Sequence, residues 1–83
     1  MTSIQDKLKE KGLKITPQRI AIYEAVVELS NHPSAENIID FIKNNHPYIS
    51  VGTVYKILNV FVEHKLLKKV KSERDIMRYY AIM

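Results

Sequence analysis

A helical pattern that gives way to a strand pattern is the feature that most constrains the fold of this chain. Residues 50–62, S-V-G-T-V-Y-K-I-L-N-V-F-V, begin with a serine suited to capping a helix and carry apolar residues at helical spacing. The segments 66–71 and 77–82 instead suit two short strands, joined by a polar connector. The sequence therefore predicts a helix that is followed almost directly by a basic antiparallel hairpin.

Three further helix starts precede this segment, and each is marked by a hydroxyl residue that can cap a helix. Ser3, Thr16 and Ser34 take this position, and Pro17 follows Thr16 where a missing N–H costs nothing. Gly12 is a natural stop for the first of these helices. The sequence thus predicts a mainly α fold with a small β-hairpin, in which four helices are followed by a two-stranded antiparallel wing.

The apolar positions predict which side of each helix faces the core. The helix after Thr16 is the most apolar, so we expect it at the centre of the core. In the helix after Ser50, a helical wheel leaves Ile57 and Val60 outside the apolar stripe and puts Tyr55 at its boundary. The predicted stripe consists of Val51, Val54, Leu58, Phe61 and Val62.

Length, composition and charge limit the classes of protein to consider. Eighty-three residues suit one domain with a modest core, so we expect residues 1–83 to form a single domain. The chain has no cysteine, no signal peptide and no apolar run long enough for a membrane span, which favours a cytoplasmic protein. The net charge of +4 is divided between two basic ends, residues 1–19 and 56–83, around an acidic middle. A polyanion would bind both ends if they share one face.

The third and fourth predicted helices are separated by a short turn region, which is the layout of a helix-turn-helix. The fourth helix fits the DNA major groove, and its first turn offers hydroxyls and backbone N–H groups to phosphate. Tyr55 can contact a thymine methyl, and Lys56 can reach a guanine edge or the backbone. The DNA-binding residues predicted from this helix and the wing are Ser50, Gly52, Thr53, Tyr55, Lys56, Lys69, Lys71 and Arg74.

The same residues also have ordinary structural interpretations. Ser50 would cap a helix in any protein, Tyr55 could be a half-buried core tyrosine, and hairpin lysines commonly guard a strand edge. A second hypothesis is a winged-helix module that binds protein through Ile57 and Val60. The sequence disfavours an enzyme, because it has no cysteine, only two glycines and no paired carboxylates spaced suitably near a histidine.

Three motifs resemble the N-terminal domain of the ferric uptake regulator family, which includes metal- and peroxide-sensing bacterial repressors. They are G-L-K-I-T-P-Q-R at residues 12–19, H-P-S-A at 32–35 and S-V-G-T-V-Y-K at 50–56. The resemblance implies a winged helix that binds an A/T-rich palindromic operator as a dimer. It also implies that Lys14 lies near the minor groove, that Tyr55 touches thymine, and that Arg19 either contacts phosphate or helps to pack the domain.

The chain departs from the family pattern in two ways. Family members usually continue into a second domain that dimerises and binds metal, and residues 1–83 do not include it. His32 matches a histidine that often ligates the regulatory ion, but Tyr80 stands where the partner acid usually lies, and tyrosine is a poorer ligand for a divalent ion. We therefore expect no metal site within this chain. Fe, Mn or Zn are the candidate ions of a full-length protein, in which His32 would be a ligand only with the second domain.

Overall fold

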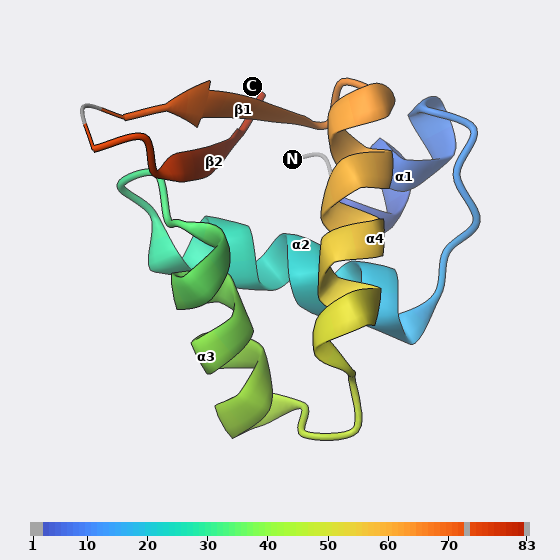
Figure 1. Cartoon of the computed structure of the whole chain (residues 1–83). Helices are drawn as coiled ribbons and strands as arrows, with labels where there is room; N and C mark the ends of the chain where they lie inside the picture. The colour runs from blue at the N-terminus through green and yellow to red at the C-terminus, as the bar shows by residue number, and fades with distance from the viewer. Residues whose placement is uncertain (1–2, 73, 83) are drawn as a thin grey trace.

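The computed structural model describes residues 3–72 and 74–82, which form four helices and then a hairpin (Figure 1). In Figure 1, α4 crosses in front of α2, α3 lies to one side, and the hairpin lies across the end of the molecule where α4 finishes. This is the helix and strand order that the sequence predicted. The helices are α1 (Ile4–Glu10), α2 (Pro17–Leu29), α3 (Ala35–Asn45) and α4 (Val51–Glu63), and the strands are β1 (Leu67–Lys71) and β2 (Met77–Ala81).

Hydroxyl caps begin all four helices, as predicted. Ser3, Thr16, Ser34 and Ser50 each accept a hydrogen bond from the backbone N–H three residues further on, at 3.1–3.2 Å. At α3 the cap is a reciprocal capping box, because the Asn37 side-chain oxygen also accepts a hydrogen bond from the Ser34 N–H at 3.1 Å. Such caps stabilise a helix by about 1 kcal/mol each. Within residues 3–72 and 74–82, no helix is long and apolar enough to cross a membrane.

Gly12 ends α1 in the way the sequence indicated. Its φ of +72° lies in the left-handed region that favours glycine. The Gly12 N–H donates to the Lys9 carbonyl and the Leu13 N–H donates to the Leu8 carbonyl, both at 2.9 Å. These two bonds form a Schellman motif, which satisfies carbonyls at the end of the helix. Leu13 is then buried, so the linker to α2 starts from a fixed point.

The core draws on all four helices and on the hairpin. Its two largest fully buried side chains, Tyr23 of α2 and Phe61 of α4, meet edge to face with ring centroids 5.9 Å apart. The Tyr23 hydroxyl lies 3.4 Å from the Lys7 ammonium nitrogen, which gives this buried residue a polar partner. Other buried members of the same cluster are Leu8, Ile22, Ile38, Ile42, Leu58 and Leu67.

The hairpin is attached to the turn between α2 and α3. The Tyr79 N–H of β2 donates to the Pro33 carbonyl at 2.9 Å, and Ser34 forms an isolated antiparallel bridge with Arg78. The Arg78 guanidinium donates to the His32 carbonyl at 3.1 Å. The turn therefore acts as a partial third strand along the free edge of β2, and it fixes the wing relative to the start of α3.

The structure corrects the predicted rotation of α4 about its axis. Val51 was predicted to face the core but is 42% exposed, whereas Ile57 was predicted to lie outside and is only 8% exposed. Val60 and Val62 are both partly buried against the core. Because apolar residues occur on nearly every side of α4, their pattern does not determine which side faces inward. The prediction that Ile57 and Val60 form an exposed protein-binding patch was therefore wrong, since Ile57 belongs to the core. The buried side of α4 consists of Val54, Ile57, Leu58 and Phe61.

Candidate nucleic-acid interface

The exposed face of α4 starts at the N-terminus of the helix. Its residues follow the spacing i, i+1, i+4, i+5 and i+8, which is one side of an α-helix. A Cβ atom at Gly52 would meet nothing within 4 Å, so this side is open. The predicted contact residues Gly52, Tyr55 and Lys56 thus share one face. The members of this exposed α4 face are Val51, Gly52, Tyr55, Lys56 and Asn59.

The two predicted hydroxyls meet at the first turn of α4. Ser50 Oγ lies 2.8 Å from Thr53 Oγ1 and also accepts the Thr53 N–H at 3.2 Å. No acidic residue lies in this turn, and the sequence from Phe41 to Val62 contains neither aspartate nor glutamate. The positive end of the helix dipole is therefore not offset by a carboxylate of its own segment. This geometry suits a phosphate group.

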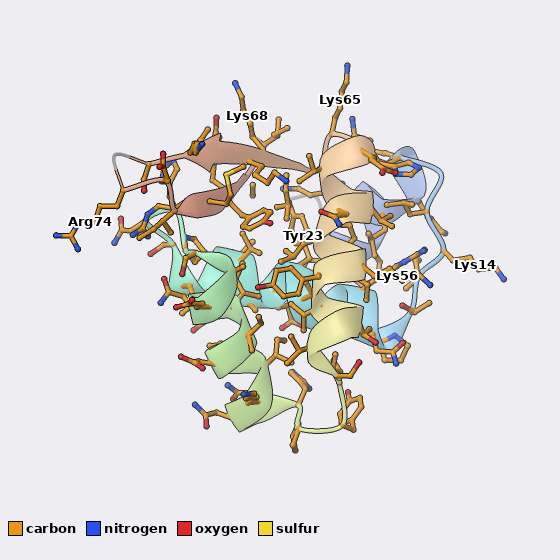
Figure 2. The ribbon with its side chains drawn as sticks, viewed as in Figure 1. Lys14, Tyr23, Lys56, Lys65, Lys68 and Arg74 are labelled. Atoms are coloured by element: carbon orange, nitrogen blue, oxygen red, sulfur yellow. The ribbon has the colours of Figure 1, made fainter. Side chains whose placement is uncertain are left out.

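Lys14 lies in the linker before α2, where Arg19 supports the backbone. The Arg19 guanidinium donates to the Lys14 carbonyl at 2.9 Å, while Leu13 on the other side is buried. The Lys14 side chain is exposed and points away from the body of the molecule, on the same side of α4 as Lys56 (Figure 2). Of the two roles left open for Arg19, this bond favours packing, because the side chain holds the linker that carries Lys14.

The predicted wing residues lie in different surroundings. Lys69 and Tyr55 line one groove, which also includes Asn59, Tyr79, Glu36 and Asp75. The Lys71 ammonium nitrogen lies 3.5 Å from a carboxylate oxygen of Asp75, and both side chains are largely exposed. Such surface pairs contribute about 0–1 kcal/mol, so a phosphate can replace the aspartate. Arg74 projects from the far end of the wing, on the opposite side of the molecule from Lys14 (Figure 2).

Tyr79 is a neighbour of Tyr55 that the sequence analysis did not identify. It is 4% exposed in β2 and lines the same groove as Tyr55. Burial raises the pKa of the Tyr79 phenol, and the nearby Tyr55 phenol raises it further. Tyr79 is thus a buried, uncharged phenol that lines the groove together with Tyr55. The alternation of side chains along β2 was the available signal, because it places Met77, Tyr79 and Ala81 on one face.

His32 does not belong to a group of metal ligands in the described part of the chain. Its exposed ring contacts the Tyr80 ring in a tilted arrangement, with ring centroids 4.5 Å apart. The hollow beside these rings also contains Lys7, Val26 and Val27, and none of its lining residues is a carboxylate or a cysteine. Across residues 3–72 and 74–82, no three His, Cys, Asp or Glu side chains are close enough to hold an ion. The residues present therefore do not fit a divalent metal site.

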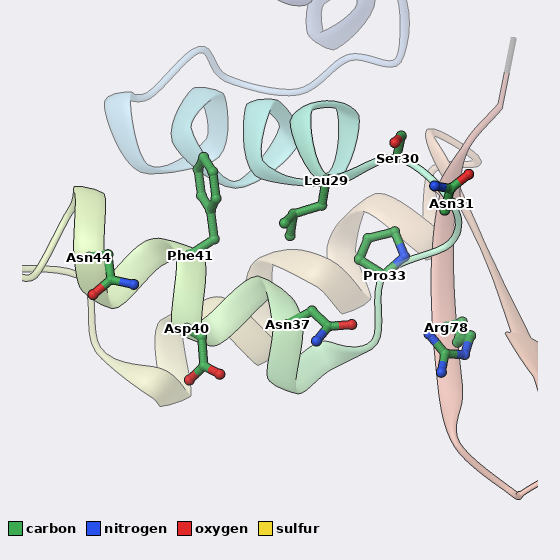
Figure 3. A pocket seen from close by; sticks show the side chains of 9 residues that line it. All are labelled: Leu29, Ser30, Asn31, Pro33, Asn37, Asp40, Phe41, Asn44 and Arg78. Carbon is green, nitrogen blue, oxygen red and sulfur yellow. The ribbon is translucent and has the colours of Figure 1, made fainter.

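A second hollow lies between the end of α2, α3 and β2 (Figure 3). Leu29 and Phe41 fill the space between the two helices, and Asn37 and Arg78 approach it from α3 and from the strand. Asp40 is the one carboxylate in its lining, which has no histidine. The Arg78 guanidinium already donates to the His32 carbonyl. This lining offers no acid–base pair for catalysis.

The chain belongs to the ferric uptake regulator family, because the family model matches residues 10–82. The match covers most of the chain and confirms the resemblance inferred from the three motifs. Among curated relatives, the peroxide operon regulator of Bacillus subtilis (strain 168) is 45% identical over 65 residues, which cover 78% of this chain and 45% of the relative. The chain thus spans about half the length of the curated relatives it matches.

Solved structures confirm the winged-helix fold. The ferric uptake regulator of Vibrio cholerae superimposes with a TM-score of 0.88 at 26% identity, covering 98% of this chain and 63% of that one. The peroxide-sensing regulator PerR of Streptococcus pyogenes gives a TM-score of 0.79 at 32% identity, covering 94% and 54%. By their names, these three similar proteins regulate gene expression or ion uptake.

Proposed function

We propose that this chain is the operator-binding domain of a metal- or peroxide-responsive bacterial repressor that acts in the cytoplasm. The observation that carries this proposal is the exposed α4 face, which begins at a capped helix N-terminus in a segment without carboxylates. The Vibrio cholerae structure was described in terms of its DNA-binding domains, and the Bacillus subtilis relative is named a peroxide operon regulator. Both descriptions support a role in transcription.

In this proposal α4 enters the major groove with its N-terminal half. A helix of 13 residues is about 20 Å long and fits a groove about 12 Å wide. Ser50, Thr53 and the backbone near Gly52 bind phosphate at the rim. Tyr55 contacts a thymine, and Lys56 contacts a guanine edge or the next phosphate.

The remaining cations bind the duplex on either side of α4. Lys14 extends from its linker toward the minor groove, and Arg19 keeps that linker in place through the Lys14 carbonyl. Lys69, Lys71 and Arg74 contact the flanking sugar–phosphate backbone, where Lys71 exchanges Asp75 for a phosphate. Contacts of this kind set the position of the protein and make binding sensitive to salt.

We further propose that the full-length repressor binds an A/T-rich palindrome as a homodimer, with one copy of this domain on each half-site. Dimerisation, and the binding of Fe, Mn or Zn, would then belong to a second domain outside residues 1–83, and His32 would become a ligand only in its presence. Residues 1–83 alone should then sediment as a monomer and bind a single half-site weakly. A tight dimer of this chain in sedimentation would contradict that division of roles.

The proposal is tested by binding at several salt concentrations. The 83-residue chain is titrated by fluorescence anisotropy into an A/T-rich palindromic duplex and into a scrambled duplex of equal composition. The expected result is tighter binding to the palindrome, with log K falling by about 0.9 per phosphate contact for each unit of log salt. Equal affinity for both duplexes would reject base-specific recognition, and a flat salt dependence would reject DNA binding altogether.

A further inference from the structure

Val51 is an exposed apolar residue at the first position of α4. It is 42% exposed, and Tyr55, one helical turn further on, is 43% exposed. Residues at i and i+4 lie above one another on the same side of a helix. The two side chains thus present adjacent apolar surface at the N-terminal end of the exposed α4 face.

Neither the core nor the helix explains a valine at this position. The buried side of α4 begins at Val54, and Val51 lies outside it. The helix start is already satisfied by Ser50, whose hydroxyl accepts the Thr53 N–H. Valine is a weaker helix former than alanine or the long polar residues, because its branched side chain loses rotamer freedom. Stability would therefore be served equally well by a different residue.

The surroundings of Val51 indicate an anionic partner that carries a small apolar group. The paired hydroxyls of Ser50 and Thr53 lie beside it, Lys56 follows on the same face, and no carboxylate occurs between Phe41 and Val62. In the major groove of DNA, the thymine 5-methyl is the apolar group that a base edge presents. One helical turn of about 5.4 Å corresponds to between one and two base steps of about 3.4 Å.

We propose that Val51 is a specificity-determining residue that contacts the 5-methyl group of a thymine, beside the thymine contacted by Tyr55. This inference rests on the proposed function, because it requires α4 to lie in the major groove. It adds a second apolar contact, so the half-site should prefer two thymines within one or two base steps of each other. The hydroxyls and Lys56 bind the charged backbone around these contacts and hold the valine against the base edge.

The test removes the methyl group from the DNA and the side chain from the protein. A preferred duplex is first selected from a random pool by the 83-residue chain, and each thymine is then replaced singly by uracil. For the unaltered protein, uracil at the Val51 contact should weaken binding about fourfold, the value for one buried methyl-sized group. Val51→Ala should lose at least about fourfold on the thymine duplex and show no further loss on that uracil duplex.

Val27→Ala is the matched control, because Val27 is a 52% exposed valine on α2 rather than α4. It should bind every duplex as the unaltered chain does, and neither variant should lower the unfolding midpoint appreciably. The inference is overturned if Val51→Ala binds the thymine duplex as tightly as the unaltered chain does. It is also overturned if, at every thymine, uracil weakens binding of Val51→Ala by the same factor as it weakens binding of the unaltered chain. If no duplex is enriched over the starting pool, the proposed function fails instead, so the two failures can be told apart.

Discussion

Both sides of α4 carry apolar side chains, yet these side chains have different surroundings. Val54, Leu58 and Phe61 are at most 1% exposed and pack in the core, whereas Val51 and Tyr55 on the other side are 42% and 43% exposed. Apolar content is therefore not by itself a sign of burial in this helix. Because the two sets belong to different sides, substitutions should separate stability from DNA binding within thirteen residues.

The largest effect is expected on the buried side. Leu58→Ala should lower the free energy of unfolding by about 2–5 kcal/mol, because it removes a fully buried side chain and leaves a cavity. Urea denaturation followed by circular dichroism measures the change. Val51→Ala serves as the comparison and should shift the free energy of unfolding by no more than about 0.5 kcal/mol. Equal costs for the two variants would mean that the two sides of α4 do not differ as described.

Tyr55→Ala should act mainly on DNA binding. A loss of about 1–3 kcal/mol on the selected duplex is expected, with relaxed preference at one A·T pair, because a base contact is removed. Tyr55→Phe keeps the ring and removes only the hydroxyl, so it should retain the preference for thymine. An equal loss on selected and scrambled duplexes would show that Tyr55 contacts the backbone rather than a base.

Gly52→Ala should change stability and DNA binding in opposite directions. A Cβ at this helical position meets nothing within 4 Å, so alanine should stabilise the free chain by about 0.4–1 kcal/mol. Affinity for DNA should fall, because the added methyl occupies space where the helix backbone approaches phosphate. Thermal unfolding and anisotropy measure the two effects. Unchanged affinity would place the contact elsewhere on α4.

Lys14→Ala should have the smallest effect, which appears in the salt dependence. The slope of log K against log salt should become less steep by about 0.9 if this lysine neutralises one phosphate. Lys9→Ala is the matched control, since Lys9 is an exposed lysine on α1 and changes the net charge equally. Identical slopes for both variants would show that Lys14 affects DNA binding only through the net charge of the protein and not through a phosphate contact.

The features that could be predicted from the sequence are those that depend on neighbouring residues. A cap is made by a hydroxyl and an N–H three residues apart, so Ser3, Thr16, Ser34 and Ser50 were correctly identified. The rotation of α4 depends on contacts with α2 and the hairpin, and its apolar residues do not settle it. For this reason the sequence wrongly placed Val51 in the core and Ile57 on the surface.

The sequence predicted which residues of α4 belong to the candidate site, but not the contacts that hold the site residues in place. Gly52, Tyr55 and Lys56 do share a face, as their spacing suggested. The bond from Arg19 to the Lys14 carbonyl depends on a long side chain reaching back along a linker. The position of Tyr79 beside Tyr55 depends on how the hairpin packs against α4. The first depends on the conformation of an irregular linker, which no periodic pattern encodes, and the second results from tertiary packing.

The bonds between β2 and the turn after α2 also bear on how the chain folds. The bond from Arg78 to His32 spans 46 residues, and the bond from Tyr79 to Pro33 lies beside it. Contacts between such distant residues form late, because a long loop must close first. During synthesis all four helices emerge before β2, so the α2–α3 turn lacks this partner until β2 itself has been made. The second strand of the hairpin therefore fastens a turn that was made much earlier.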